Sequence, residues 1–181
     1  MRDIVKVALR LLVIMVVAGL CLGATYAVTK DPIAEQQRVQ AENARRAVLP
    51  DAVSFEEVQL NASDAITACY RGIDASGEPC GYAFSVDAKG FGGAVGLTVG
   101  VSNGVITGVR IGSHSETPGL GAKAADEAFY GQFTGKSGEL TVTKTGAVSD
   151  QDINAITAAT ITSKAVTGAV NEVLAAAETL E

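Results

Sequence analysis

The pattern of apolar and polar positions divides the chain into three stretches. From Leu11 to Val28 no residue is charged, and only Thr25 and Tyr26 are clearly polar. This run is close to the roughly 20 apolar residues that a helix needs to cross a bilayer. The sequence therefore predicts a cytoplasmic N-terminus and transmembrane helix over residues 1–30, a polar linker over 31–50 and a folded domain over 51–181.

The linker is predicted to be a separate helix. Asp31-Pro32 is typical of a helix start, because Asp accepts hydrogen bonds from free backbone N–H groups and Pro fits the first helical turn. Mostly polar residues follow from Ile33 to about Val48, and Leu49-Pro50 is expected to end the helix. A helix this polar is suited to be a spacer between the membrane and the domain.

The domain begins with five runs rich in β-branched residues and separated by Gly, Asn and Asp, which is typical of strands. They are Val53–Leu60, Ala65–Arg71, Gly81–Asp87, Val95–Ser102 and Val105–Ile111. Asn103-Gly104 lies between the last two and predicts a tight hairpin turn. These runs predict an antiparallel sheet.

Two helices and one further strand are predicted after the sheet. Ala122–Phe133 carries Phe129 and Phe133 on one side, and residues 161–178 have a helical apolar period. That apolar face contains Ile161, Ala165, Ala169, Val170, Val173, Leu174 and Ala177. Leu140–Thr143 is a short candidate strand. The predicted fold class is therefore α+β, with a single N-terminal transmembrane helix followed by an extracytoplasmic antiparallel sheet packed with helices.

The charges beside the apolar run predict its orientation. Arg2, Lys6 and Arg10 precede it, and no basic excess follows it. The positive-inside rule then places the N-terminus in the cytoplasm and the domain outside. A cleaved signal peptide is the alternative. It is disfavoured because Thr25-Tyr26-Ala27 is a poor cleavage site and the apolar run exceeds the usual length.

Composition excludes several classes of function. The net charge of −6 and the pI near 4.8, with no basic cluster in the domain, argue against nucleic acid binding. His114 is the single histidine, and no cysteine spacing is typical of zinc or iron–sulfur binding, so no metal site is expected. Outside the cytoplasm Cys69 and Cys80 could form a disulfide, but their spacing leaves this open.

Three stretches carry candidate chemistry. Thr157–Ser163 is rich in hydroxyls at a predicted helix start, where hydroxyls cap N–H groups and where phosphates also bind. His114–Gly121 places an imidazole, a carboxylate and a hydroxyl beside Pro118-Gly119, which predicts a type II turn. A glycine cluster, Gly90–Gly93, is either a tight turn or bulge or part of the same site.

The first two stretches resemble the motifs of the FMN-binding domain family. Thr157–Ser163 is similar to its flavinylation motif, Ser/Thr-Gly-Ala-Thr-x-x-Ser/Thr, and His114–Gly121 is similar to its His-x-Glu-Thr-Pro-Gly-Leu-Gly signature. The family includes the G subunits of Rnf complexes and the C subunits of sodium-pumping NADH:quinone reductases. This chain has Ala158 where the family usually has Gly, which is unfavourable if the position requires a positive φ.

The resemblance implies an electron-transfer subunit of a membrane-bound, ion-translocating ferredoxin:NAD⁺ oxidoreductase of the Rnf type, with no catalysis of its own. The expected cofactor is FMN, held by a phosphoester to Thr160 and installed from FAD by a flavin transferase. The other expected partners are the remaining membrane and peripheral Rnf subunits and the lipid bilayer. The implied cofactor-binding residues are Thr160, Thr157, Ala158, Ala159, Ile161, Thr162, Ser163, Lys164, His114, Glu116, Thr117, Leu120 and Gly121.

Two alternatives remain open from the sequence. The nearer one is the C subunit of a sodium-translocating NADH:quinone reductase, although the short chain and the Asp31-Pro32 junction favour the Rnf type. The other is a membrane-anchored structural module without flavin, which Ala158 would favour.

Overall fold

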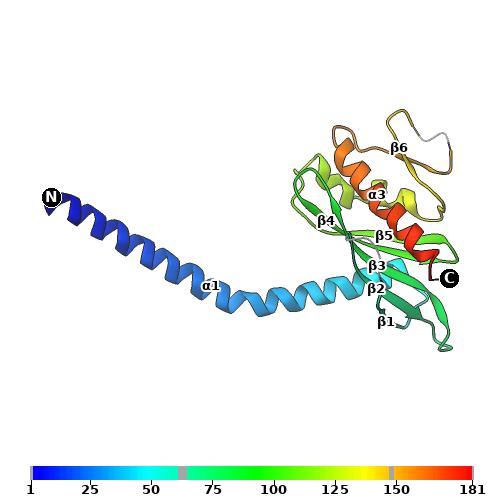
Figure 1. Ribbon diagram of the computed structural model, residues 1–181, viewed down its shortest axis with the longest axis horizontal. Helices are drawn as coiled ribbons and strands as arrows, with labels where there is room; N and C mark the ends of the chain where they lie inside the picture. The colour runs from blue at the N-terminus through cyan, green and yellow to red at the C-terminus, as the bar shows by residue number, and fades with distance from the viewer. Residues whose placement is uncertain (1, 61–64, 147–148, 181) are drawn as a thin grey trace. The chain divides into compact units, whose positions relative to one another are not determined.

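The computed structural model describes residues 2–60, 65–146 and 149–180 (Figure 1). The chain forms two compact units, Met1–Gln40 and Ala41–Glu181. The first unit is part of a long helix, and the second contains every strand of the described residues.

The first helix, α1, runs from Arg2 to Val48 without a break. The described residues contain one helix long and apolar enough to cross a membrane, and it is this one. The prediction that a new helix starts at Pro32 is wrong, because Pro32 lies inside α1. Proline removes one backbone hydrogen bond, but the Ala, Glu, Gln and Arg residues after it favour helix strongly enough for the helix to continue.

The second unit is built on a five-stranded antiparallel sheet, which confirms the predicted strands. Its strands follow one another in sequence order: β1 (Ser54–Val58), β2 (Ile66–Ile73), β3 (Pro79–Lys89), β4 (Ala94–Ser102) and β5 (Val105–His114). Asn103 and Gly104 have φ of 51° and 69°, so the β4–β5 hairpin turn has the two positive φ angles of a type I′ turn.

Helix α3 (Thr160–Ala177) packs on one face of this sheet, against β3 and β4. Val166, Val170 and Val173 of the helix are fully buried among apolar side chains such as Phe84 and Val99. Most of the predicted apolar face therefore lies in the core. Ile161 is the exception, because it lies in the first turn of the helix and is 56% exposed.

The opposite face of the sheet receives the end of α1. Val48 is fully buried, and its main chain lies so close to Gly100 that a Cβ there would meet the Val48 carbonyl. The Thr107 hydroxyl donates a hydrogen bond to the same carbonyl oxygen. Gly100 and Thr107 thus fix the point at which the helix joins the domain.

The predicted helix over residues 122–133 is instead three short segments. They are the 3₁₀ helix η1 (Gly121–Ala125), helix α2 (Glu127–Tyr130) and the 3₁₀ helix η2 (Gly131–Phe133). Asp126 causes the first break, because it is extended at φ −80° and ψ 140°. Phe129 and Phe133 still lie on the same side, both buried, with their rings edge to face at 5.6 Å.

Two short strands complete the domain, and one of them was not predicted. β6 (Thr141–Thr143) lies within the predicted 140–143 strand and pairs in parallel with β7 (Asp152–Asn154). Asn171 of α3 anchors this pair, because its side chain accepts a hydrogen bond from the Leu140 N–H and donates one to the Leu140 carbonyl, both at 2.9 Å. β7 leads directly into the residues that precede α3.

The cysteines are free thiols. Cys69 of β2 pairs with Phe84 of β3, whereas Cys80 lies four residues from Phe84 along β3. Cys69 is buried in the core, and this burial raises the pKa of its thiol to about 11. The register of β2 and β3 therefore separates the two residues considered for a disulfide.

Candidate functional site

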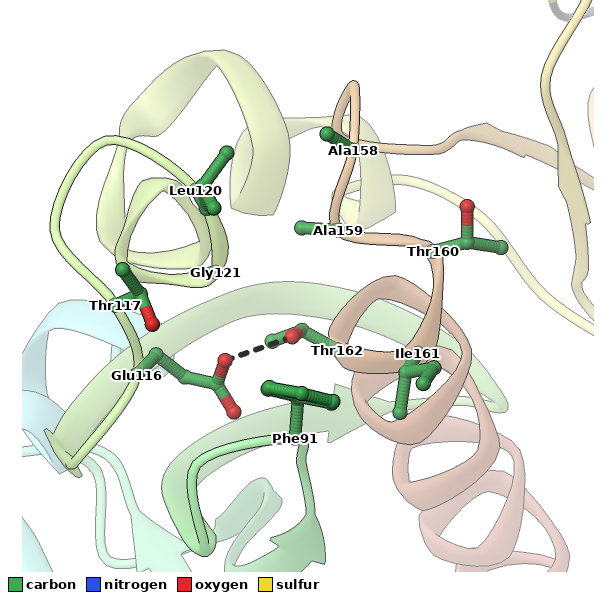
Figure 2. A pocket seen from close by; sticks show the side chains of 10 residues that line it. All are labelled: Phe91, Glu116, Thr117, Leu120, Gly121, Ala158, Ala159, Thr160, Ile161 and Thr162. Atoms are coloured by element: carbon green, nitrogen blue, oxygen red, sulfur yellow. Dashed lines mark hydrogen bonds between the residues drawn. The ribbon is translucent and has the colours of Figure 1, made fainter.

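A cavity of about 390 Å³ lies where three loops meet beside the start of α3 (Figure 2). Its volume is within the range of small-molecule sites, about 300–1,000 Å³. The lining residues come from the β3–β4 connection, from the segment after β5 and from the α3 start. They are Phe91, Glu116, Thr117, Leu120, Gly121, Ala158, Ala159, Thr160, Ile161 and Thr162.

The two predicted motifs face each other across this cavity. Figure 2 shows Glu116, Thr117 and Leu120 on one side, residues 158–162 on the other and Phe91 at one end. Thr160 lies at the edge of the group, and its hydroxyl is on the side away from Glu116. The sheet and α3 thus bring together segments that are far apart in the sequence.

Glu116 joins all three segments. Its carboxylate is 6% exposed and accepts hydrogen bonds from the Gly92 N–H at 3.0 Å and from the Thr162 hydroxyl at 2.9 Å. Burial raises the pKa of this carboxyl, but the hydrogen bonds from Gly92 and Thr162 and the nearby His114 outweigh that effect. The net result is a lowered pKa, so Glu116 is held as a carboxylate.

Close approach around Glu116 accounts for one glycine in each of the two loops, Gly92 and Gly121. A Cβ on Gly121 would meet the Glu116 carboxylate and lie 2.9 Å from the Thr162 hydroxyl, and a Cβ on Gly92 would meet the Ser115 carbonyl. The Pro118-Gly119 turn also forms as predicted. Gly119 has φ of 80°, and the Leu120 N–H donates to the Thr117 carbonyl at 3.1 Å.

The start of α3 is not capped by a hydroxyl, contrary to prediction. Its N-cap residue is Ala159, which has no side chain that could accept a hydrogen bond. The N–H groups of Thr160, Ile161 and Thr162 therefore have no intrahelical partner, as is usual in a first turn. Ala158, just before, has φ of 62°, a conformation that glycine adopts at less cost.

Ser163 holds the loop before α3 from inside the helix. Its hydroxyl is fully buried, accepts a hydrogen bond from the Ile156 N–H at 2.9 Å and donates one to the Ala159 carbonyl at 3.0 Å. The Ala159 N–H in turn donates to the Ile156 carbonyl at 3.0 Å. These bonds close residues 156–159 into a tight turn.

The structure gathers most, but not all, of the predicted site residues. Glu116, Thr117, Leu120, Gly121 and residues 158–162 line the cavity, whereas four predicted residues do not: Thr157, Ser163, Lys164 and His114. Thr157 and Lys164 are exposed, and the half-buried His114 has a buried Nδ1 without a hydrogen-bond partner. Phe91 lines the cavity but was not among the predicted residues, although its glycine cluster was noted as a candidate.

These features fit a flat aromatic ligand with a phosphate. Three large apolar residues that line the cavity, Phe91, Leu120 and Ile161, are 73%, 42% and 56% exposed, although such side chains are usually buried. The N–H groups of the α3 first turn are suited to a phosphate. The described residues contain no group of His, Cys, Asp and Glu side chains suited to a metal ion.

Comparison with known proteins agrees with this chemistry. The FMN-binding domain family matches residues 90–175, a range that contains every residue lining the cavity. The structure also resembles that of NqrC from Shewanella oneidensis, with a TM-score of 0.51 over 67% of this chain and 65% of that one. At 21% identity, this likeness concerns the fold.

Two curated relatives cover nearly the whole chain. The G subunit of the Na(+)-translocating ferredoxin:NAD(+) oxidoreductase complex of Acetobacterium woodii is 40% identical over 94% of this chain and 89% of its own length. The G subunit of the proton-translocating ferredoxin:NAD(+) oxidoreductase complex of Clostridium ljungdahlii is 39% identical over 86% of this chain and 82% of its own length.

Proposed function

This chain belongs to the family of G subunits of ion-translocating ferredoxin:NAD⁺ oxidoreductase complexes, and we propose that it carries electrons on FMN in a membrane-bound complex of that type. The observation that carries the proposal is the cavity at which both family motifs meet. When bound, FMN supplies the redox chemistry, and the protein binds and orients it. The other subunits of such a complex are the expected partners.

The proposed attachment point is Thr160. Thr160 is half-buried, lines the cavity and is the first residue of α3, whose first-turn N–H groups have no intrahelical partner. The Thr160 hydroxyl oxygen would form a bond to the phosphorus of the FMN half of FAD. The bond from that phosphorus to the bridging oxygen would break, AMP would leave, and the hydroxyl proton would pass to solvent. A separate flavin transferase would carry out this exchange.

The remaining cavity residues would hold the group in place. The N–H groups of Thr160, Ile161 and Thr162 would donate to phosphate oxygens. The exposed Lys164 is one helical turn after Thr160, so its positive charge would lie near the same phosphate. Phe91, Leu120 and Ile161 offer apolar surface to a ring system. Glu116, Thr117 and Gly121 would form the wall beside the ring or the ribityl chain, while His114 would act through Glu116 rather than by direct contact.

The same family membership motivates a membrane location. We place residues 11–28 of α1 across the lipid bilayer, with the N-terminus in the cytoplasm and the FMN domain outside. The basic residues Arg2, Lys6 and Arg10 support this orientation. Residues 31–50 would then connect the membrane to the domain over residues 51–181.

Thr160→Ala tests the attachment directly. The parent chain, coexpressed with a flavin transferase, should keep its yellow colour and fluorescence on a denaturing gel, whereas the variant should be colourless. Far-ultraviolet circular dichroism should be unchanged, because Thr160 makes no side-chain hydrogen bond that caps the helix. An undiminished FMN mass adduct on the variant would exclude Thr160 as the site.

Thr157→Ala is the matched control. Thr157 is a threonine of the same motif, but it is exposed and lies outside the cavity lining. Its removal should leave most of the covalent FMN in place.

A parent chain that loses all its flavin on denaturation would instead show non-covalent binding.

A further inference from the structure

We propose that Ser163 is a positioning residue that presents Thr160 for modification, and that it does not touch the cofactor. The inference rests on the proposed attachment of FMN at Thr160. Ser163 is fully buried and absent from the cavity lining, so its hydroxyl cannot act on a ligand there. Both of its hydrogen bonds go to the backbone of the loop before α3.

The bond from Ile156 distinguishes Ser163 from an ordinary helical serine. A serine in a helix often donates to the carbonyl four residues earlier, and the bond to the Ala159 carbonyl is of that kind. The bond that Ser163 accepts comes from the Ile156 N–H, seven residues earlier and outside the helix. One hydroxyl therefore holds both ends of residues 156–159.

This arrangement replaces an N-cap side chain and leaves the helix start open. A Ser, Thr, Asp or Asn at the N-cap would accept a hydrogen bond from one of the first-turn N–H groups. Ala159 cannot do so, and the loop is stabilised instead by the hydrogen bond from the Ile156 N–H to the Ser163 hydroxyl in α3. The N–H groups beside Thr160 thus remain available for the phosphate.

The loop needs this support because its conformation is unfavourable in isolation. Ala158 has φ of 62°, and a residue with a Cβ is disfavoured in this region relative to glycine. The Ile156 carbonyl accepts a hydrogen bond from the Ala159 N–H within the turn, and the Ile156 N–H donates one to the Ser163 hydroxyl in α3. Without the Ser163 hydroxyl, the Ile156 N–H loses its acceptor and the loop can relax to more common conformations.

The test measures the rate of FMN attachment to the full-length chain in detergent, with a purified flavin transferase and FAD, by intact mass. Ser163→Ala removes the hydroxyl and little else, and we expect attachment to slow by about tenfold or more, because small displacements of a reacting group are costly. Ser163→Thr keeps a hydroxyl at this position and should be modified at close to the parent rate. Hydrogen exchange at the Ile156 amide should be faster in Ser163→Ala than in the parent and in Ser163→Thr.

Thr167→Val is the matched control. Thr167 is one turn further along α3, is also buried, and its hydroxyl has no hydrogen-bond partner. Removing it at constant volume should leave attachment and Ile156 exchange unchanged. If Ser163→Ala does not give folded protein, Ser163→Cys provides the second variant, because its thiol fills the space of the hydroxyl with a somewhat larger atom that is only a weak acceptor. It should also be modified slowly.

The outcomes separate this inference from the proposed function. A parent chain that acquires no FMN at Thr160 would contradict the proposed function itself. A parent that is modified normally, together with a folded Ser163→Ala or Ser163→Cys variant modified at the same rate, would overturn the role of Ser163 alone. An equal slowing in Thr167→Val would also overturn it, because any buried hydroxyl of α3 would then have the same effect.

Discussion

At the scale of single residues, Ala158 is the clearest departure from the family motif. Its φ of 62° shows that the position adopts the left-handed conformation for which the family's usual glycine is suited. We expect Ala158→Gly to raise stability by up to about 1 kcal/mol, since relief of the strained backbone exceeds the added entropy of the unfolded chain. FMN attachment should be at least as fast as in the parent.

Ala159→Gly is the control for this change. Ala159 is 8% exposed and has φ of −132°, so a glycine there relieves no strain and removes a buried methyl group. Thermal unfolding should show a higher midpoint for Ala158→Gly and a lower one for Ala159→Gly. Equal losses in both variants would mean that the Ala158 methyl matters more than its backbone conformation.

The buried carboxylate of Glu116 predicts a pH dependence of stability. The fold lowers its pKa from 4.5, so its contribution is fully present above that pH and is lost as the pH falls through the folded value. Glu116→Gln removes the charge that the Gly92 and Thr162 donors stabilise. We expect a loss on the order of 1 kcal/mol at neutral pH, which shrinks as the pH falls below about 4.

Thermal unfolding of both proteins across this pH range measures the difference. Glu56→Gln is the control, because Glu56 is an exposed residue of β1. It should track the parent at every pH. A Glu116→Gln curve that stays parallel to the parent down to acid pH would show that the charge of Glu116 does not stabilise the fold.

At the scale of elements, the sequence predicted what depends on long local patterns. Five strands, their hairpin and the C-terminal helix were each marked by several residues of alternation or helical period. The segment over residues 122–133 places Phe129 and Phe133 on one side as a helix would, but the extended backbone of Asp126 breaks it, and the short pieces contact β5. β7 is three residues long, too short to show any period.

The lining of the cavity was predictable to the extent that its residues belong to motifs. Those motifs identified Glu116, Thr160 and most of the cavity lining, but they could not separate residues that face the cavity from those that face the core. Thr162 and Ser163 are adjacent hydroxyl residues with different hydrogen-bond partners, Glu116 and Ile156. Only their positions around the helix axis, which the motif does not give, distinguish them. The contribution of Phe91 follows from the sheet, which brings the β3–β4 connection beside α3.

At the scale of the whole molecule, the question is on which side of the membrane the FMN domain lies. The basic residues Arg2, Lys6 and Arg10 precede the apolar segment of α1, and no basic excess follows it. Each Lys or Arg beside a transmembrane segment favours placing that end of the segment in the cytoplasm. A reporter active only after export, fused behind Glu181, should therefore be active, and a reporter active only in the cytoplasm should not.

The same two reporters fused before Met1 provide the control and should give the opposite pair of results. Replacing Arg2, Lys6 and Arg10 by Asn should weaken the preference, so that both reporters behind Glu181 become partly active. Activity of the cytoplasmic reporter alone behind Glu181 would place Thr160 and its cavity in the cytoplasm. That result would overturn the proposed orientation of α1, with the N-terminus in the cytoplasm and the domain outside.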